Sequence, residues 1–175
     1  AAAALAGAAL VWAVARRAPG QREALIGLVY VAGASAAVVG ATWAPHGREQ
    51  LTALLAADVL WAPWSATLLL ALAAALVALA GRRLGRDAWF YPVFALTLSA
   101  AVPALGLYLV FALLIAPALW RARGWRLSRA LALAGLACAL GLAASWALDW
   151  PSGACVALAL CGSGLATAWR ARGAA

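Results

Sequence analysis

The chain has 175 residues, of which 68% are hydrophobic and only 10% are charged, and its net charge is +8. A soluble domain is about half apolar and about one quarter charged, so this composition excludes a soluble fold. It predicts an all-α, polytopic transmembrane helix bundle with almost no extramembrane domain. All thirteen basic residues are arginines in short segments between apolar spans. Membrane topology and anionic lipid explain them there better than nucleic acid does.

The first predicted span covers residues 1–15, and the arginines that follow it place its end in the cytoplasm. The chain begins without methionine and already inside this apolar stretch, so we expect the natural protein to continue upstream. A second span, residues 24–44, leads outward to a loop that carries the only histidine. A short segment, residues 51–61, reads as an interfacial helix before the third span, residues 64–80.

Three outer residues are candidate metal ligands: His46, Glu49 and Asp58. An imidazole and two carboxylates on one outer surface form a donor set that suits zinc, and neutral imidazole suits zinc better than manganese. The set is neither clustered nor complete. The alternative is an exposed loop histidine, a helix-start glutamate and an interfacial aspartate.

The chain is organised around an uncharged stretch from Val93 to Trp120. As one helix it would be about 40 Å long, which exceeds a hydrocarbon core of about 30 Å. Arginines flank both ends, so both ends are predicted to face the cytoplasm. The stretch is then a broken or re-entrant element with two short arms, bent near Pro103–Gly106. The alternative is a single tilted helix with a proline kink.

Two further spans complete the chain, residues 130–148 and 152–169. Ala137, Gly141 and Ser145 recur every four residues, which predicts a smooth face for a neighbouring helix. The turn between the spans runs from Asp149 to Gly153, with Pro151 suited to the first turn of the following helix.

No motif for chemistry is present in the sequence. There is no phosphate-binding G-x-x-x-x-G-K-[ST], no H-E-x-x-H, no Cys-x-x-Cys and no G-x-S-x-G. The five acidic residues all lie outside the middle of the spans, so no proton relay is expected. The chain is therefore predicted not to be an enzyme and to bind no cofactor. The readings that remain are a transporter subunit, a membrane scaffold or assembly protein, and the disfavoured lipid enzyme.

Four stretches resemble one family in order and spacing from about residue 20 onward. The first is residues 21–27 (QREALIG), and the second is residues 45–61, which are similar to the pattern "HG…LL.G.ILW". The third is residues 106–118, similar to "G..LV.A.LI.PA", and the fourth is residues 145–153, similar to "S...D.PSG". The chain resembles the integral membrane permeases of bacterial ABC transporters for zinc, manganese or chelated iron. Ala57 departs from the family's usual glycine, and the family's N-terminal helices, which carry polar residues of the path, are absent.

The resemblance implies a permease homodimer in the bacterial inner membrane, with two cytoplasmic ABC ATPase subunits that bind ATP and an extracytoplasmic solute-binding protein. The 175 residues would form one transmembrane domain, roughly the C-terminal two-thirds of the family's full domain. The expected substrate is a divalent transition metal, zinc first, then manganese or iron. A non-metal solute remains the alternative.

Two sets of residues are predicted to serve transport. The substrate path would use hydroxyls and the backbone around the broken element, and the outer-turn motif is the turn that resembles the family's "S...D.PSG". The path residues are Ser99, Pro103, Gly106, Pro117 and Ser145, and the outer-turn residues are Asp149, Pro151, Ser152 and Gly153. The ATPase is expected to dock on the basic turn before the broken element, formed by Arg82, Arg83, Leu84, Gly85 and Arg86. The alternative is that these arginines only anchor topology.

Overall fold

A computed structural model describes residues 13, 19–43 and 63–170. This part of the chain forms six α-helices and two short 3₁₀ helices, without a strand, so the all-α prediction is confirmed. The helices are η1 (Pro19–Gln21), α2 (Arg22–Ala41), α4 (Trp64–Ala80), η3 (Gly81–Gly85), α5 (Asp87–Leu105), α6 (Leu107–Ala122), α7 (Leu127–Leu148) and α8 (Ser152–Arg170). By length and hydropathy α2, α5, α7 and α8 can each cross a membrane, and α4 and α6 are shorter apolar helices.

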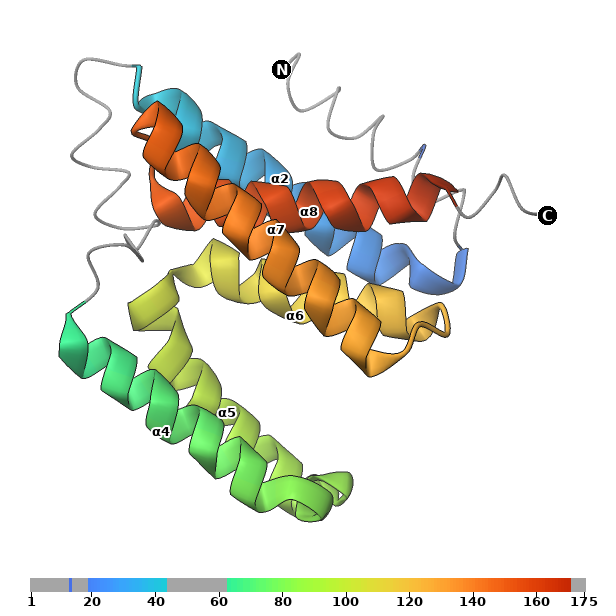
Figure 1. Cartoon of the computed structure of the whole chain (residues 1–175). Coiled ribbons are helices and arrows are strands. Elements are labelled where there is room, and N and C mark those ends of the chain that lie inside the picture. Colours follow the sequence, from blue (N-terminus) through green and yellow to red (C-terminus); the bar gives the residue numbers. More distant parts are fainter. Residues whose placement is uncertain (1–12, 14–18, 44–62, 171–175) are drawn as a thin grey trace.

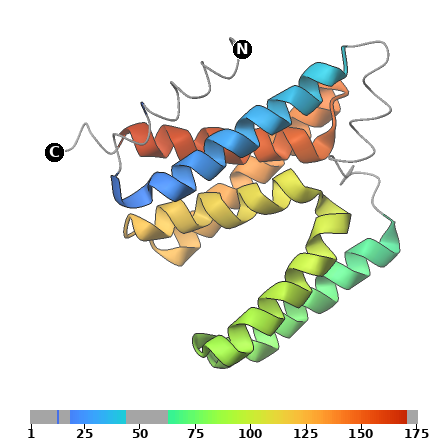
Figure 2. The ribbon, with the colours of Figure 1, turned by 180° about the vertical axis from the view of Figure 1, so that it is seen from behind.

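Four helices form a packed core, with α8 in contact with each of the others (Figures 1 and 2). The main cluster of buried side chains comes from α2, α6, α7 and α8, and Trp120 is its largest fully buried member. The indole Nε1 of Trp120 donates a hydrogen bond to Thr167 Oγ1 at 2.9 Å, so this buried donor is satisfied. The core therefore joins the end of α6 to the end of α8.

The small residues of α7 let α8 approach closely. The buried residues of α7 are Ala130, Ala134, Ala137, Gly141 and Ser145, which confirms the predicted smooth face. A Cβ atom on Gly141 would lie 2.5 Å from the Cα atom of Val156. That contact is with backbone, so neither helix can yield by changing a rotamer. Van der Waals packing of this kind replaces the hydrophobic effect as the cause of helix association in lipid.

The α4–α5 hairpin stands apart from the four-helix core (Figures 1 and 2). Helix α4 has the predicted bounds, packs against α5, and buries none of its residues. Its side chains are nearly all apolar, which suits a helix surrounded by lipid or by another apolar surface. Helix α5 leads into α6, and the contacts between these two complete the link to the core.

The central stretch is broken at Gly106, so the bent form is confirmed and the single tilted helix is wrong. Gly106 has φ 82° and ψ 151°, which ends α5 and starts α6 at the next residue. Of the two expected short arms, only the second is short: α6 has 16 residues, whereas α5 has 19 and begins at Asp87, directly after the basic turn. The prolines do not end the helices: Pro103 lies within α5 and Pro117 within α6. Membrane helices tolerate proline because neighbouring groups and local adjustments of the helix satisfy the backbone groups that proline frees.

The ends of the helices sort onto two sides. Figure 1 shows the start of α2, the η3 turn, the α6–α7 turn and the end of α8 toward the right, and the Gly106 break and the α7–α8 turn toward the left. Arginines lie at all four positions on the right, including Arg22, Arg83, Arg121 and Arg170. This arrangement is the one that the arginine distribution predicts, with the basic side in the cytoplasm.

The close contact at Gly141 generates a stability prediction. Gly141→Ala is expected to lower the free energy of unfolding by about 1–3 kcal/mol, because its methyl group would overlap the α8 backbone. Thermal denaturation of the purified protein in detergent measures the change. The matched control is Gly135→Ala on the same helix, where a Cβ meets nothing within 4 Å and stability should stay equal or rise slightly. Equal effects of the two substitutions would contradict the packing.

Candidate functional site

The break at Gly106 places polar backbone inside an apolar segment. The Gly106 N–H donates to the Val102 carbonyl oxygen at 2.9 Å, and its own carbonyl oxygen accepts from the Val110 N–H at 3.2 Å. Gly106 is buried, and the last turn of α5 meets the first turn of α6 at this residue. The last carbonyl groups and first N–H groups of two helices lack partners within their own helices. Such interrupted helices are found where membrane proteins bind or pass polar ligands.

The predicted path residues lie on different surfaces. Ser99 and Pro103 are exposed on α5, Gly106 is buried at the break, Pro117 is half-buried in α6, and Ser145 is buried in α7. An apolar hollow of about 170 Å³ lies inside the bend, and its lining comes from α5 and α6. None of the five predicted path residues lines it, and its one hydroxyl, on Thr97, donates to the Val93 carbonyl oxygen at 2.8 Å. The five residues do not line one cavity in this structure. Their role in a substrate path therefore stays a prediction.

The outer-turn motif is a compact connection between α7 and α8. Asp149 takes a left-handed conformation with φ 52°, and the Trp150 N–H donates to the Ser145 carbonyl oxygen at 3.1 Å. The Ser145 hydroxyl donates to the Trp150 carbonyl oxygen at 2.6 Å. Aspartate tolerates this backbone region better than most residues do. Ser145, predicted as a path residue, thus has a visible role in closing the turn.

Two further residues of the motif begin α8. Pro151 precedes the helix directly, and its carbonyl oxygen accepts from the Cys155 N–H at 3.1 Å. Ser152 and Gly153 are buried at the first turn. Trp150 also packs edge-on against Trp43 at the end of α2, with ring centroids 5.6 Å apart. The motif therefore fixes the outer ends of α2, α7 and α8 together.

The basic turn between α4 and α5 is exposed and short. η3 turns the chain at Gly81, which has φ 39°, and Arg86 is extended before α5 begins. The Arg83 guanidinium lies over the Trp89 ring, 5.8 Å from its centroid, a cation–π contact. Gly85 has no atom within 4 Å of a built Cβ, and Leu84 is half-buried. The predicted docking residues thus sit at the far tip of the α4–α5 hairpin.

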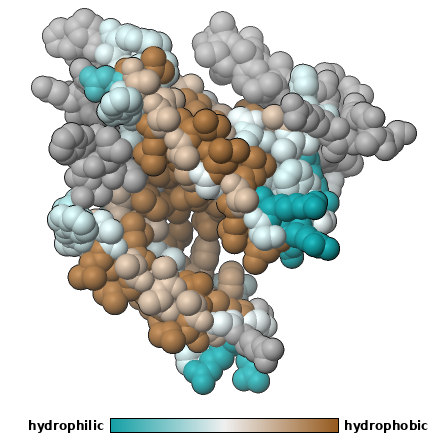
Figure 3. All heavy atoms as spheres, viewed as in Figure 1, coloured by the Kyte–Doolittle hydropathy of each residue, from teal (hydrophilic) through white to brown (hydrophobic). Residues whose placement is uncertain are grey.

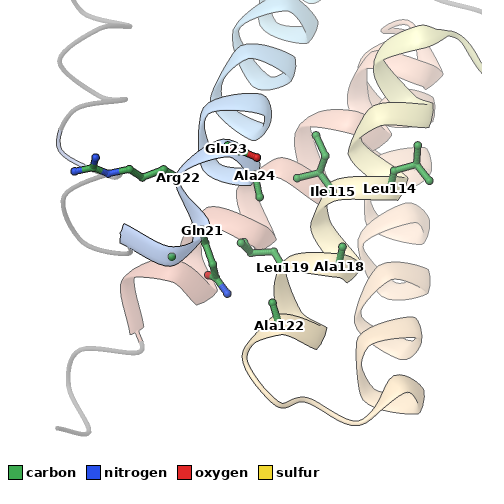
Figure 4. A pocket seen from close by; sticks show the side chains of 10 residues that line it. Gln21, Arg22, Glu23, Ala24, Leu114, Ile115, Ala118, Leu119 and Ala122 are labelled. Atoms are coloured by element: carbon green, nitrogen blue, oxygen red, sulfur yellow. The ribbon is translucent and has the colours of Figure 1, made fainter.

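A groove of about 630 Å³ opens between the start of α2 and the C-terminal half of α6 (Figure 4). Its α6 wall is apolar and includes Leu119 and Ala118, whereas Gln21 of η1 and Glu23 of α2 contribute polar groups. In Figure 4 the Arg22 side chain points away from the groove. Arg22 is nevertheless one of the residues that line the groove, so its polar lining combines an amide, one carboxylate and one arginine.

Sequence reasoning missed a link between this groove and the α6–α7 turn. Arg123 Nε donates to Gln21 Oε1 at 3.0 Å, although the two residues are 102 positions apart. Burial lowers the pKa of the Arg123 guanidinium from its ordinary value, and its Nη1 is buried without a hydrogen-bond partner. Arg123 is therefore a packed residue that ties α2 to the end of α6. The only available signal was the resemblance that singled out residues 21–27.

The predicted metal ligands His46, Glu49 and Asp58 lie outside the described residues. Within residues 13, 19–43 and 63–170, no group of three His, Cys, Asp or Glu side chains could hold a metal ion. The cysteines of this part are separate free thiols in α7 and α8.

Comparison with known proteins gives one match. Residues 86–170, from the basic turn through α8, match the family described as the ABC 3 transport family. No curated protein and no solved structure matches the chain. The matched segment contains the Gly106 break, the outer-turn motif and the three helices that follow the break, α6, α7 and α8.

The backbone at Gly106 generates a conformational prediction. Gly106→Ala is expected to change the angle of the α4–α5 hairpin, because φ 82° with ψ 151° is open essentially to glycine alone. Spin labels at Leu79 on α4 and Leu127 on α7, in a cysteine-free background, report the distance between hairpin and core. A shifted or broadened distance distribution is expected. Gly162→Ala, at an exposed helical glycine of α8 with open space around it, is the control and should leave the distribution unchanged.

Proposed function

We propose that the chain is a membrane subunit of an ABC transporter and that it imports a divalent transition metal, because residues 86–170 match the model of the ABC 3 transport family. Zinc is the first candidate, followed by manganese and iron. The proposal places the chain in the inner membrane of a bacterium as a multi-pass permease. ATP hydrolysis belongs to a separate cytoplasmic subunit, since the sequence has no phosphate-binding loop.

The observation that carries the proposal is the broken helix between a packed core and a separate hairpin. The core of α2, α6, α7 and α8 is held by the close α7–α8 contact and the buried cluster around Trp120. The α4–α5 hairpin joins it at Gly106 and carries the basic turn at its far end. A force on that turn would rotate the hairpin about a glycine hinge, which is a common basis for gated access.

The proposed path for the metal passes the broken element. The last carbonyl groups of α5, which lack partners within their own helix, would supply oxygen ligands, and Ser99 lies one helical turn before Pro103 on the same helix. Such weak oxygen ligands let a divalent cation pass without trapping it. At the outer mouth, His46 with Glu49 and Asp58 would receive the metal from an extracytoplasmic solute-binding protein, because imidazole suits zinc.

The proposed assembly contains two copies of this permease and two ATPase subunits. The exposed apolar faces of α4 and α5 supply surface for lipid or for a second copy. The ATPase would dock on the tip formed by residues 82–86, where Arg83 and Arg86 are exposed. The tip is the part of the hairpin farthest from the hinge at Gly106. A force that the partner applies there therefore exerts the largest torque on the hinge.

The first prediction of this proposal concerns coupling. Replacing Leu84 and Gly85 with glutamine is expected to uncouple ATP hydrolysis from transport by at least tenfold, because bulk at the tip would displace the partner. The measurement is ATPase activity and substrate uptake in vesicles that contain the full-length permease and its ATPase. Gly135→Gln, at an open site on α7, is the control for added bulk. Normal coupling in the Leu84/Gly85 variant would remove the turn from the mechanism.

The second prediction concerns the substrate. Cells that carry the full-length permease with its partners are expected to take up radioactive zinc, and His46→Ala is expected to lower that uptake several-fold. Manganese uptake should fall less, because imidazole contributes less to manganese binding. Undiminished uptake of both metals in His46→Ala would remove the histidine from the path. Transport of an organic solute with no metal uptake would overturn the substrate proposal itself.

A further inference from the structure

Two exposed arginines, Arg126 and Arg129, lie at the start of α7. Other arginines make the side-chain hydrogen bonds of the α6–α7 turn. Those bonds come from Arg121, whose Nη1 donates to the Trp125 carbonyl oxygen at 2.7 Å, and from Arg123, which donates to Gln21. Arg126 and Arg129 are exposed, and their spacing of three places them on one side of the helix. Two guanidinium groups are thus free to bind an anion at the cytoplasmic edge.

The turn that carries these arginines is well fixed. Gly124 has φ 81°, and its N–H donates to the Arg121 carbonyl oxygen at 2.9 Å. The Trp125 ring stacks on buried Trp120, with centroids 6.4 Å apart, and Trp125 itself is exposed at its edge. A tryptophan in this setting anchors the turn at the membrane–water interface. A fixed turn loses little conformational entropy when it binds a ligand.

A row of leucines continues from the arginines along α7. Arg129, Leu133, Leu136 and Leu140 follow one another at intervals of four, three and four residues, so they form one stripe of the helix. Leu136 and Leu140 are 56% and 60% exposed. From Arg129 to Leu140 the helix rises about 16 Å, close to the half-thickness of about 15 Å of a bilayer core. The stripe therefore offers positive charge at the headgroup level and apolar surface along one leaflet.

We propose that this stripe of α7 binds an anionic phospholipid of the cytoplasmic leaflet. The phosphodiester contacts Arg126 and Arg129, and an acyl chain lies along Leu133, Leu136 and Leu140. The N-terminus of α7 has no side-chain cap, so its free N–H groups add to the attraction for phosphate. Figure 3 shows the hydrophilic surface at this end of the core directly beside the apolar surface of α7. This continuity favours a lipid over a soluble anion, because a soluble anion has no acyl chain to contact the leucines.

The experiment measures binding of dioleoylphosphatidylglycerol to the full-length permease in detergent by native mass spectrometry. Arg126→Gln/Arg129→Gln is expected to weaken this binding on the order of 30-fold, from the typical contribution of an arginine near an anionic lipid surface. Arg83→Gln/Arg86→Gln removes the same charge from the other basic turn and should change binding less than twofold. Equal losses in the two double variants would show diffuse charge attraction and overturn the site. Tight binding of the zwitterionic dioleoylphosphatidylcholine would also overturn it.

A second pair of variants tests the acyl chain. Leu136→Ala/Leu140→Ala is expected to weaken phosphatidylglycerol binding several-fold, whereas Leu127→Ala/Leu131→Ala, equally exposed on another side of α7, should not. Equal effects of these two pairs of substitutions would overturn the proposal that an acyl chain lies along this stripe. Millimolar inorganic phosphate should fail to displace the lipid, and displacement would assign the site to free phosphate instead. Unchanged melting temperatures confirm that every variant is folded.

Discussion

The structure depends on one backbone constraint, the positive φ of Gly106. A continuous helix from Asp87 to Ala122 would carry the chain in one direction, and its two arginine-rich ends would lie on opposite sides of the membrane. The break at Gly106 turns the chain back, so both ends reach the basic side. It also separates the chain into a packed core and a hairpin that touches the core mainly near the break. A glycine is needed there because a side chain would disfavour that backbone region.

The core and the hairpin differ in how they are held together. In the core, small residues such as Gly141 bring helices into backbone contact, and Gly164 similarly accommodates Leu28 of α2. Close packing of this kind fixes one arrangement, because any shift creates overlap or an empty space. Helix α4 has no buried residue and packs against α5 and the η3 turn, so the hairpin meets the core mainly through the contacts between α5 and α6. In the proposed mechanism, the core on one side of Gly106 stays rigid and the hairpin on the other side rotates. This difference is the physical basis for the proposed gated access.

The arginines of the basic side have different physical roles, although they look alike in sequence. Arg83 lies over an aromatic ring, and Arg121 and Arg123 hold the α6–α7 turn and its link to Gln21. Arg126 and Arg129 are exposed at the start of a leucine stripe. Topology needs only the total positive charge near the membrane. The separate roles arise from neighbours that each arginine meets after folding.

The sequence alone determined the membrane class, most helix bounds, the bend near Gly106 and the small-residue face of α7, because each follows from a local pattern of hydropathy, charge or spacing. Residues 64–80 became α4 without correction, whereas α5 began earlier than expected, at Asp87, directly after the extended residue Arg86. Only the tertiary structure decided that Ser145 closes a turn, that Arg123 meets Gln21, and that the predicted path residues do not line one hollow. These facts depend on which faces of distant helices meet, and hydropathy carries little information about that in a chain apolar on nearly every face.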